Sequence, residues 1–180
     1  QIKEAVIGFA QANGRLPCPA SGTIAAGATN AGAEAFAANV CTSAFGVIPW
    51  STLGVPESDA WGRRFSYRVS PAFADANAAG TWATATTTLP ASLANQASCV
   101  PSPTPSAPAS FALCTLGDIA VLNPTDTTKA PTTAVSSSVP AIIISHGKNG
   151  YGAYQSNGIQ IVRTSGSHET DNNTGGADSN

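Results

Sequence analysis

The chain has 180 residues, of which 42% are hydrophobic and only 10% are charged, and its formal net charge is −2 at pH 7. This length and hydrophobic content suffice for one domain with its own core, and the low, slightly negative charge argues against nucleic acid or an anionic membrane as a partner. No run of about 18 apolar residues occurs, so no part of the given sequence is predicted to span a membrane.

Residues 1–13 predict a helix. Apolar side chains recur along one face at helical spacing, and we expect this face to pack on the rest of the domain: Ile2, Val6, Phe9 and Ala10. Asn13 and Gly14 suit a left-handed cap, and Pro17 forbids continuation of the helix. No capping residue precedes the apolar pattern, so we expect it to be the end of a longer helix that begins before Gln1.

Residues 15–45 predict a long loop, rich in Gly, Ala, Asn and Thr, with a short helical piece at residues 33–38. The segment that follows, from Gly46 to Val55, is apolar but interrupted by Pro49. Because proline cannot donate to a strand ladder, this segment is expected to contribute packing rather than a central strand.

Residues 57–71 predict a turn followed by a half-buried strand. Asp59 and Gly62 suit the turn, where the carboxylate bonds backbone amides, and Trp61 is expected to pack beneath the sheet. Phe65, Tyr67 and Val69 alternate with polar residues, which is typical of a strand with one face on a core.

The remaining chain predicts further short strands. The expected strands are residues 82–89, 111–114, 119–122, a fully buried or central strand at 141–144, and a last strand around Ile159 and Ile161. Residues 146–150 predict a turn, and the proline-rich stretches 101–108 and 124–140 predict surface loops. The prediction is one α+β domain over residues 1–180: helix 1–13, loops and antiparallel sheet 14–163, and a polar loop or tail 164–180.

The four cysteines are Cys18, Cys41, Cys99 and Cys114, and none of them forms a CxxC pair. Without histidines at zinc-ligand spacing, a metal cluster is not expected. Four cysteines allow three pairings, and distance along the sequence favours Cys18 with Cys41 and Cys99 with Cys114. The alternative is four reduced cysteines in the core; the neutral polar composition favours disulfides and an oxidising compartment.

The sequence around the predicted turn and strand resembles the type IV pilin-like proteins, which include the pseudopilins of type II secretion. The segment Asp59-Ala60-Trp61-Gly62, continued by Phe65 and Tyr67, is similar to the Asp-Pro-Trp-Gly-x-x-Tyr-x-Tyr segment of major pseudopilins, with Ala60 in place of Pro. Blocks at residues 14–19, 46–54 and 145–150 are similar to blocks of a pilin-like subgroup with the same Trp-Gly-Arg segment. The resemblance extends from residue 1 to about residue 152.

This resemblance implies a long N-terminal helix whose apolar first half anchors the subunit in the inner membrane or the filament core, and whose second half packs on an antiparallel sheet. It implies a structural subunit, major or minor, of a type IV pilus or a type II secretion-like filament. The expected partners are other subunits, and the expected place is the cell surface, or the inner membrane facing the periplasm before assembly. Without the anchoring half the domain is expected to be a monomer.

No enzyme or cofactor is expected. Ser145 and His146 are neighbours on a predicted strand end, so their side chains face opposite sides and do not form a catalytic pair. Major pseudopilins bind calcium in a late acidic loop, and the tail here carries oxygen ligands: Glu169, Asp171, Asn172, Asn173, Asp178 and Asn180. Their spacing matches no EF-hand pattern, so a solvated tail is the preferred interpretation.

Two binding roles are alternatives to the filament. DNA uptake requires a basic patch, for which Arg63, Arg64 and Arg68 are thin support in an acidic chain. An extracellular binding or adhesin module that recognises carbohydrate or another surface ligand is the stronger alternative. Its stacking faces would come from aromatic residues that are more often found in cores: Trp50, Trp61, Trp82, Tyr151 and Tyr154.

Overall fold

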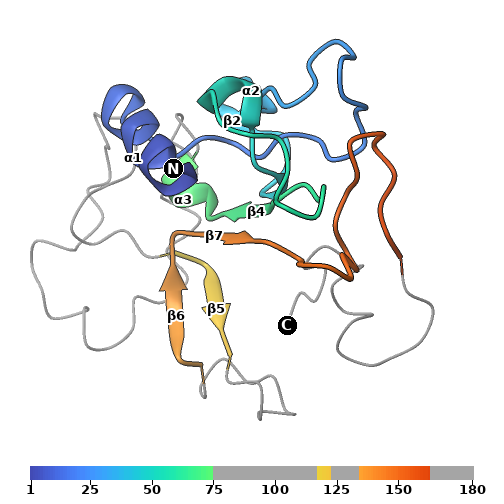
Figure 1. The fold of residues 1–180 in the computed structure, drawn as a ribbon. Coiled ribbons are helices and arrows are strands. Elements are labelled where there is room, and N and C mark those ends of the chain that lie inside the picture. The colour runs from blue at the N-terminus through green and yellow to red at the C-terminus, as the bar shows by residue number, and fades with distance from the viewer. Residues whose placement is uncertain (75–116, 123–133, 163–180) are drawn as a thin grey trace, which may run out of the picture.

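The computed structural model of the protein describes residues 1–74, 117–122 and 134–162. Within these ranges the chain forms an N-terminal helix and small antiparallel sheets (Figure 1). The helices are α1 (Ile2–Asn13), α2 (Trp50–Leu53) and α3 (Pro71–Ala74). The strands are β1 (Phe36–Ala37), β2 (Val40–Cys41), β3 (Phe45–Val47), β4 (Ser66–Val69), β5 (Ile119–Val121), β6 (Ser136–Val139) and β7 (Ala141–Ile144). The α+β class predicted from the sequence agrees with this arrangement.

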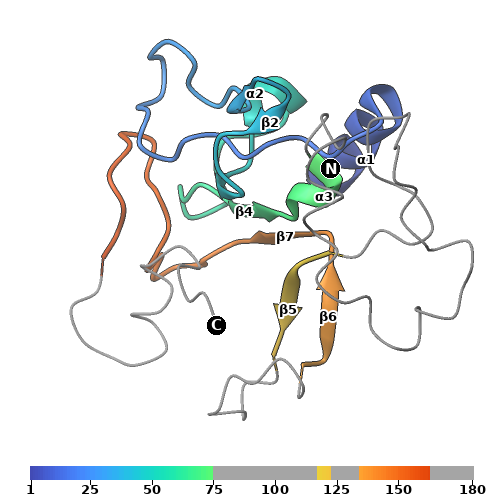
Figure 2. The same ribbon diagram turned by 180° about the vertical axis from the view of Figure 1, so that it is seen from behind.

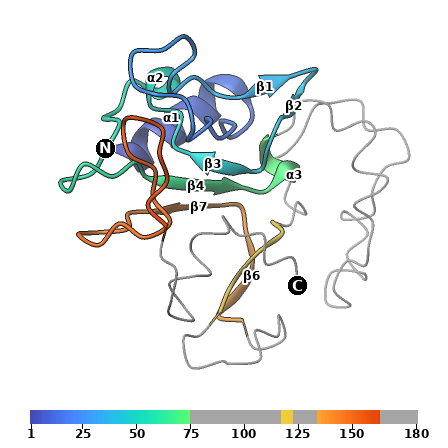
Figure 3. The same cartoon turned by 90° about the vertical axis from the view of Figure 1, so that its right-hand side faces the viewer.

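The main sheet has the strand order β3-β4-β7, and both pairings are antiparallel. Figure 3 shows the three strands lying side by side with α1 along one face of the sheet. Strands β5 and β6 form a separate two-stranded sheet that runs away from β7, as Figures 1 and 2 both show. No helix among the described residues combines the length and apolar character needed to cross a bilayer.

Helix α1 ends as predicted. Gly14 takes a left-handed conformation (φ 67°), and its amide donates to the Ala10 carbonyl at 2.8 Å, which closes the helix. At the other end, the Gln1 side chain makes no capping hydrogen bond. Val6 is 7% exposed and shares a buried cluster with Tyr67 and Val69 of β4. This cluster joins the helix to the sheet.

The rest of the predicted helix face divides between two environments. Ile2 and Ala10 pack against the buried cluster, whereas Phe9 is only partly buried and is not among the residues packed on it. The Phe9 ring instead lies 5.2 Å from the Arg15 guanidinium. Of the four residues predicted to form this face, Phe9 therefore contacts a charged side chain instead of the core cluster.

The disulfide between Cys18 and Cys41 is present, as predicted, and it closes a loop with a sequence separation of 23 residues. The prediction of a short helical piece at residues 33–38 is wrong. Strands β1 and β2 form a two-residue hairpin there, with Ala38 (φ 49°) and Asn39 (φ 68°) in the left-handed region. Two consecutive positive φ angles match the right-handed twist of a tight hairpin and are incompatible with a helix.

Three strand predictions need correction. Strand β7 forms as predicted, but it lies at the edge of the three described strands, with Ile143 and Ile144 38% and 46% exposed. The stretch 124–140, predicted as a loop, contains β6, because pairing with β5 satisfies its backbone. The last predicted strand reduces to one isolated bridge between Tyr154 and Gln160.

Other element predictions agree with the structure or lie outside it. Strand β5 falls within the predicted 119–122, and β3 is paired with β4 on one side while its Val47 forms an isolated bridge with Ala20 on the other. The four-residue helix α2 within the apolar segment was not predicted. The predicted strands at 82–89 and 111–114, the loop 101–108 and the tail 164–180 lie outside the described residues.

Candidate functional site

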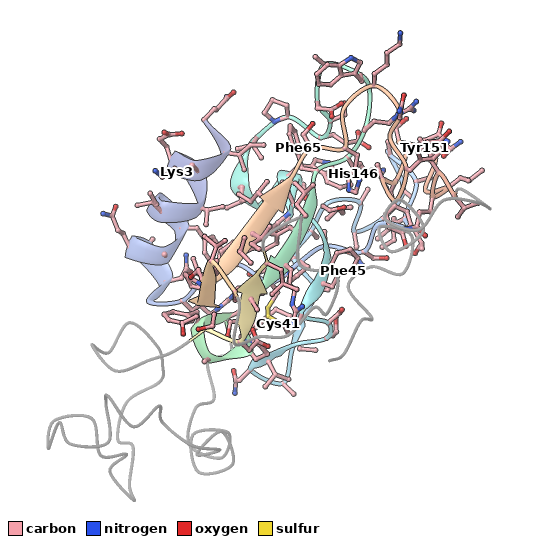
Figure 4. All side chains as sticks on the ribbon, turned by 90° about the horizontal axis from the view of Figure 1, so that it is seen from below. Lys3, Cys41, Phe45, Phe65, His146 and Tyr151 are labelled. Carbon is pink, nitrogen blue, oxygen red and sulfur yellow. A yellow bond between two sulfur atoms is a disulfide. The ribbon has the colours of Figure 1, made fainter. Side chains whose placement is uncertain are left out.

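Two turns that the sequence singled out lie next to each other in the structure. Strand β4 begins where β7 ends, since Ser66 is paired with Ile144, so the turn before β4 and the turn after β7 meet at one end of the sheet. Figure 4 shows Phe65, His146 and Tyr151 at this end, away from Cys41 and Phe45. We call residues 59–62 and 146–150 together the paired-turn site.

Asp59 connects the two turns. Its Oδ1 atom accepts hydrogen bonds from the backbone amides of Trp61 and Arg63, both at 2.9 Å, and its Oδ2 atom accepts one from Ser145 Oγ at 2.6 Å. Partial burial raises the pKa of the Asp59 carboxyl, but the bonds from Ser145 and the two amides and the charge of Arg63 outweigh it, so the pKa lies below its ordinary value. Asp59 is therefore an ionised clamp.

His146 fixes the second turn through both ring nitrogens. Nδ1 lies 2.7 Å from the Tyr151 carbonyl oxygen, and Nε2 lies 2.7 Å from Ser66 Oγ. Because a carbonyl can only accept, Nδ1 carries the proton and Nε2 accepts from the Ser66 hydroxyl. Burial lowers the pKa of His146; the bond to Tyr151 and the charge of Asp59 act in the opposite direction and do not cancel it.

The partners of Ser145 and His146 differ from a catalytic arrangement. Ser145 bonds Asp59 while His146 bonds Ser66, so the two neighbours do point to different partners. Ser66 has the distance to His146 that a nucleophile would need, but it is only 3% exposed. This geometry supports a structural role, in which the imidazole holds the start of β4 against the 146–150 turn.

Trp61 is 53% exposed, and the prediction that it packs beneath the sheet is wrong. The carboxylate of Asp59 holds the turn on its inner side, and Gly62 (φ 73°) reverses the chain, so Trp61 between them projects outward. Among the described residues, Trp50 is the tryptophan that packs on the core, and its ring lies 4.5 Å from the Arg64 guanidinium. The paired-turn site therefore presents a large aromatic side chain to the solvent.

Arg64 was considered in the sequence only as part of a basic patch, and sequence reasoning missed its structural role. It is completely buried and its guanidinium donates to Glu57 Oε1 at 2.7 and 2.9 Å. It also donates to the carbonyls of Gly22 and Ile24, both at 2.8 Å, and of Ser156 at 3.0 Å. Three segments far apart in the sequence are thus tied to one side chain. No local pattern marks such an arginine, because most of its acceptors are backbone carbonyls.

A second arginine ties down the disulfide loop. Arg15 forms a two-pronged ion pair with Glu34, with both N–O distances at 2.8 Å, and its guanidinium lies 3.8 Å from the centre of the Phe36 ring. Glu34 Oε2 also accepts a hydrogen bond from the Cys18 backbone amide at 3.1 Å. This pair joins the end of α1 to the loop that the disulfide closes.

A groove of about 300 Å³ lies beside β3. Its lining carries hydroxyl groups and two aromatic rings but no charged side chain: Pro19, Ala20, Ser21, Gly22, Thr23, Ala35, Thr42, Ser43, Phe45, Gly46 and Tyr154. Several of these hydroxyls already bond within the chain, for example Thr42 to the Ala35 carbonyl at 3.1 Å. The groove is suited to a neutral polar ligand rather than to an ion.

The remaining predicted site residues fall outside the described ranges. They are Cys99, Cys114, Trp82 and the oxygen-bearing tail residues from Glu169 to Asn180. In the part of the chain that the structure does describe, no group of three or more His, Cys, Asp or Glu residues is placed to hold a metal ion.

Comparison of the chain with protein-family models, with curated proteins and with solved structures found no match.

Proposed function

We propose that the protein is a structural subunit of a bacterial filament of the type IV pilus or type II secretion kind. The observation that carries the proposal is helix α1, which joins an antiparallel sheet through Val6 and presents another face outward. The family resemblance of the 59–67 segment and the order of elements, helix first and sheet after, support the same assignment.

The outward face of α1 offers a surface for contacts between subunits. Ile7 is 46% exposed on this helix, next to Gly8, where an added Cβ would meet nothing within 4 Å. Close approach of a neighbouring helix is favoured where the helix surface is small and apolar. We propose that the partners of this face are other subunits of the same filament.

The test uses cells that produce the full-length protein, with filaments sheared from the surface and quantified by immunoblot and electron microscopy. Ile7→Glu should abolish sheared filaments, and Gln11→Glu, which adds the same charge at another exposed position of α1, should leave them unchanged. Equal melting temperatures of the purified variants exclude unfolding as the cause. Release of the protein as a free monomer by wild-type cells would overturn the proposal.

A second test reads the coding sequence upstream of Gln1. A short basic leader followed by about 20 apolar residues is the expected result. An ordinary cleavable secretory signal would contradict the filament assignment.

An extracellular binding module is the alternative function, and two observations favour it. Trp61 is exposed at the paired-turn site, and the groove beside β3 combines hydroxyls with the rings of Phe45 and Tyr154. Aromatic faces and hydroxyl groups are the surfaces that a sugar ring contacts. Titration with neutral oligosaccharides, followed by NMR shifts, distinguishes the two places, since Trp61→Ser and Tyr154→Ala should each remove binding at one of them.

A further inference from the structure

Asn followed by Gly occurs at three places in the sequence, beginning at Asn13, Asn149 and Asn157. All three asparagines are exposed, so solvent reaches each of them. Asn-Gly is the dipeptide most open to deamidation, because glycine has no side chain to hinder its own backbone nitrogen. The three pairs share this chemistry and differ only in their surroundings, which makes their structures comparable.

Deamidation begins when the backbone nitrogen of the glycine loses its proton and attacks the side-chain carbonyl carbon of the asparagine. A carbon–nitrogen bond forms and the bond from that carbon to the side-chain nitrogen breaks. The nitrogen takes up a proton and leaves as ammonia, and a cyclic succinimide remains. Water then opens the ring to an aspartyl or an isoaspartyl residue. No oxidant or cofactor is required. A hydrogen bond donated by the glycine N–H must be broken first, and one that fixes the asparagine side chain limits its rotation toward that nitrogen.

The pair at the end of α1 is held at both reacting groups. The Gly14 amide donates to the Ala10 carbonyl at 2.8 Å, and Asn13 Nδ2 donates to the Phe9 carbonyl at 2.9 Å. Both distances lie in the normal range for a hydrogen bond. Attack at this pair requires the end of the helix to open.

The pair at Asn157 is held at its glycine. The Gly158 amide donates to the Gln155 carbonyl at 3.0 Å, and Asn157 Oδ1 accepts from the Ile159 amide at 2.9 Å. The attacking nitrogen is therefore engaged in a hydrogen bond of normal length, and the orientation of the Asn157 side chain is fixed within its turn.

The pair at Asn149 is held most weakly. The Gly150 amide donates to the His146 carbonyl at 3.4 Å, the longest of the three glycine bonds, and the Asn149 side chain makes no hydrogen bond to the residues that the structure describes. We propose that Asn149 is the deamidation site of this protein, and that the paired-turn site is therefore chemically modified with age.

The position of Gly150 makes the modification consequential. A Cβ at Gly150 would lie 2.5 Å from Arg63 Nε, so the 146–150 turn fits closely beneath that side chain. Deamidation adds one negative charge beside Arg63 and Lys148, and the isoaspartyl product adds one atom to the backbone of the turn. Both changes affect the segment between His146 and Tyr151, whose carbonyl oxygen accepts a hydrogen bond from His146 Nδ1.

The experiment incubates the folded, oxidised protein at mildly alkaline pH and follows deamidation by peptide mass spectrometry after digestion at mildly acidic pH. Position 149 should deamidate about fivefold faster than positions 13 and 157, the factor expected from a weaker hydrogen bond at the attacking nitrogen. A folded protein in which position 13 or 157 is fastest would overturn the proposal.

The control repeats the incubation on reduced protein in concentrated urea, where the three rates should converge. The same ranking in the unfolded chain would show that neighbouring sequence sets the rates, and would also overturn the proposal. In ion-exchange chromatography, Asn149→Gln should remove the first acidic species that forms, and the matched variant Asn157→Gln should leave it.

Discussion

Replacement of Arg64 by methionine is expected to remove a large part of the stability of the fold. The side chain is completely buried and its five hydrogen bonds end on Glu57 and on three backbone carbonyls. Methionine fills similar space but donates nothing, so a carboxylate that is 25% exposed and three carbonyls are left without their partner.

The magnitude follows from the burial of Arg64. Loss of one partner of a fully buried ion pair costs about 3–5 kcal/mol in the free energy of unfolding. Glu57 is partly exposed, but three backbone carbonyls also lose their donor, so a loss of this size is expected. Total stabilities are about 5–15 kcal/mol, so the variant should be marginally folded. Arg64→Lys keeps the charge but not the planar guanidinium, so its free energy of unfolding should lie between those of Arg64→Met and the wild type.

The assay is urea unfolding of the oxidised protein, followed by tryptophan fluorescence and far-UV circular dichroism. Arg68→Met is the matched control, because Arg68 is 35% exposed and its pair with Asp118 is 3.6 Å long. That exposed pair should contribute less than about 1 kcal/mol. In the Arg64→Met background, Glu57→Gln should recover stability, since it removes the unpaired charge. Equal losses for Arg64→Met and Arg68→Met would refute the reasoning.

Three further predictions concern the core, the disulfide and the pH dependence. Val6→Ala should lower the free energy of unfolding by about 2 kcal/mol, and Ile7→Ala, at an exposed position of the same helix, by less than about 0.5 kcal/mol in the same urea titration. The double substitution Cys18→Ala and Cys41→Ser removes the disulfide and should lower the free energy of unfolding by about 3 kcal/mol, because the closed loop has a sequence separation of 23 residues. Melting curves that coincide with those of the wild type would contradict this. The pKa of His146 is lowered in the folded state, so the unfolded chain takes up the proton first as the pH falls. The free energy of unfolding should therefore fall as the pH drops below about 6.5. His146→Gln should not show this decline when melting temperatures are measured across that range.

The sequence predicted the elements whose causes are local. Helix α1 follows from apolar residues at helical spacing with a glycine cap, and the turn at residue 59 follows from a carboxylate placed to accept nearby amides. The disulfide between Cys18 and Cys41 followed from proximity in the sequence. In each case the deciding interaction joins residues that are close in the chain or repeat at a fixed period.

The missed features depend on partners that are distant in sequence. Strand β6 is stabilised by pairing with β5, and nothing within residues 136–139 alone distinguishes a strand from a polar loop. The exposure of Trp61 depends on what its turn faces, and a tryptophan is usually placed in a core for lack of that information. The paired-turn site itself was predicted as two separate turns, because only the register of β4 and β7 brings them together.

The two internal arginines explain how this chain holds a long loop in place with so little charge. Residues 14–44 contain only the short β1–β2 hairpin, and a loop of this length is unusual in a compact domain unless it is anchored. The anchors are the disulfide at Cys18, the ion pair between Arg15 and Glu34, and the two loop carbonyls that accept hydrogen bonds from Arg64. Each anchor is buried or partly buried, where a charged hydrogen bond is stronger than at the surface. Substitutions between the anchors, such as at Ala28 or Ala31, should therefore be tolerated, whereas Glu34→Gln should free the loop as far as the disulfide allows.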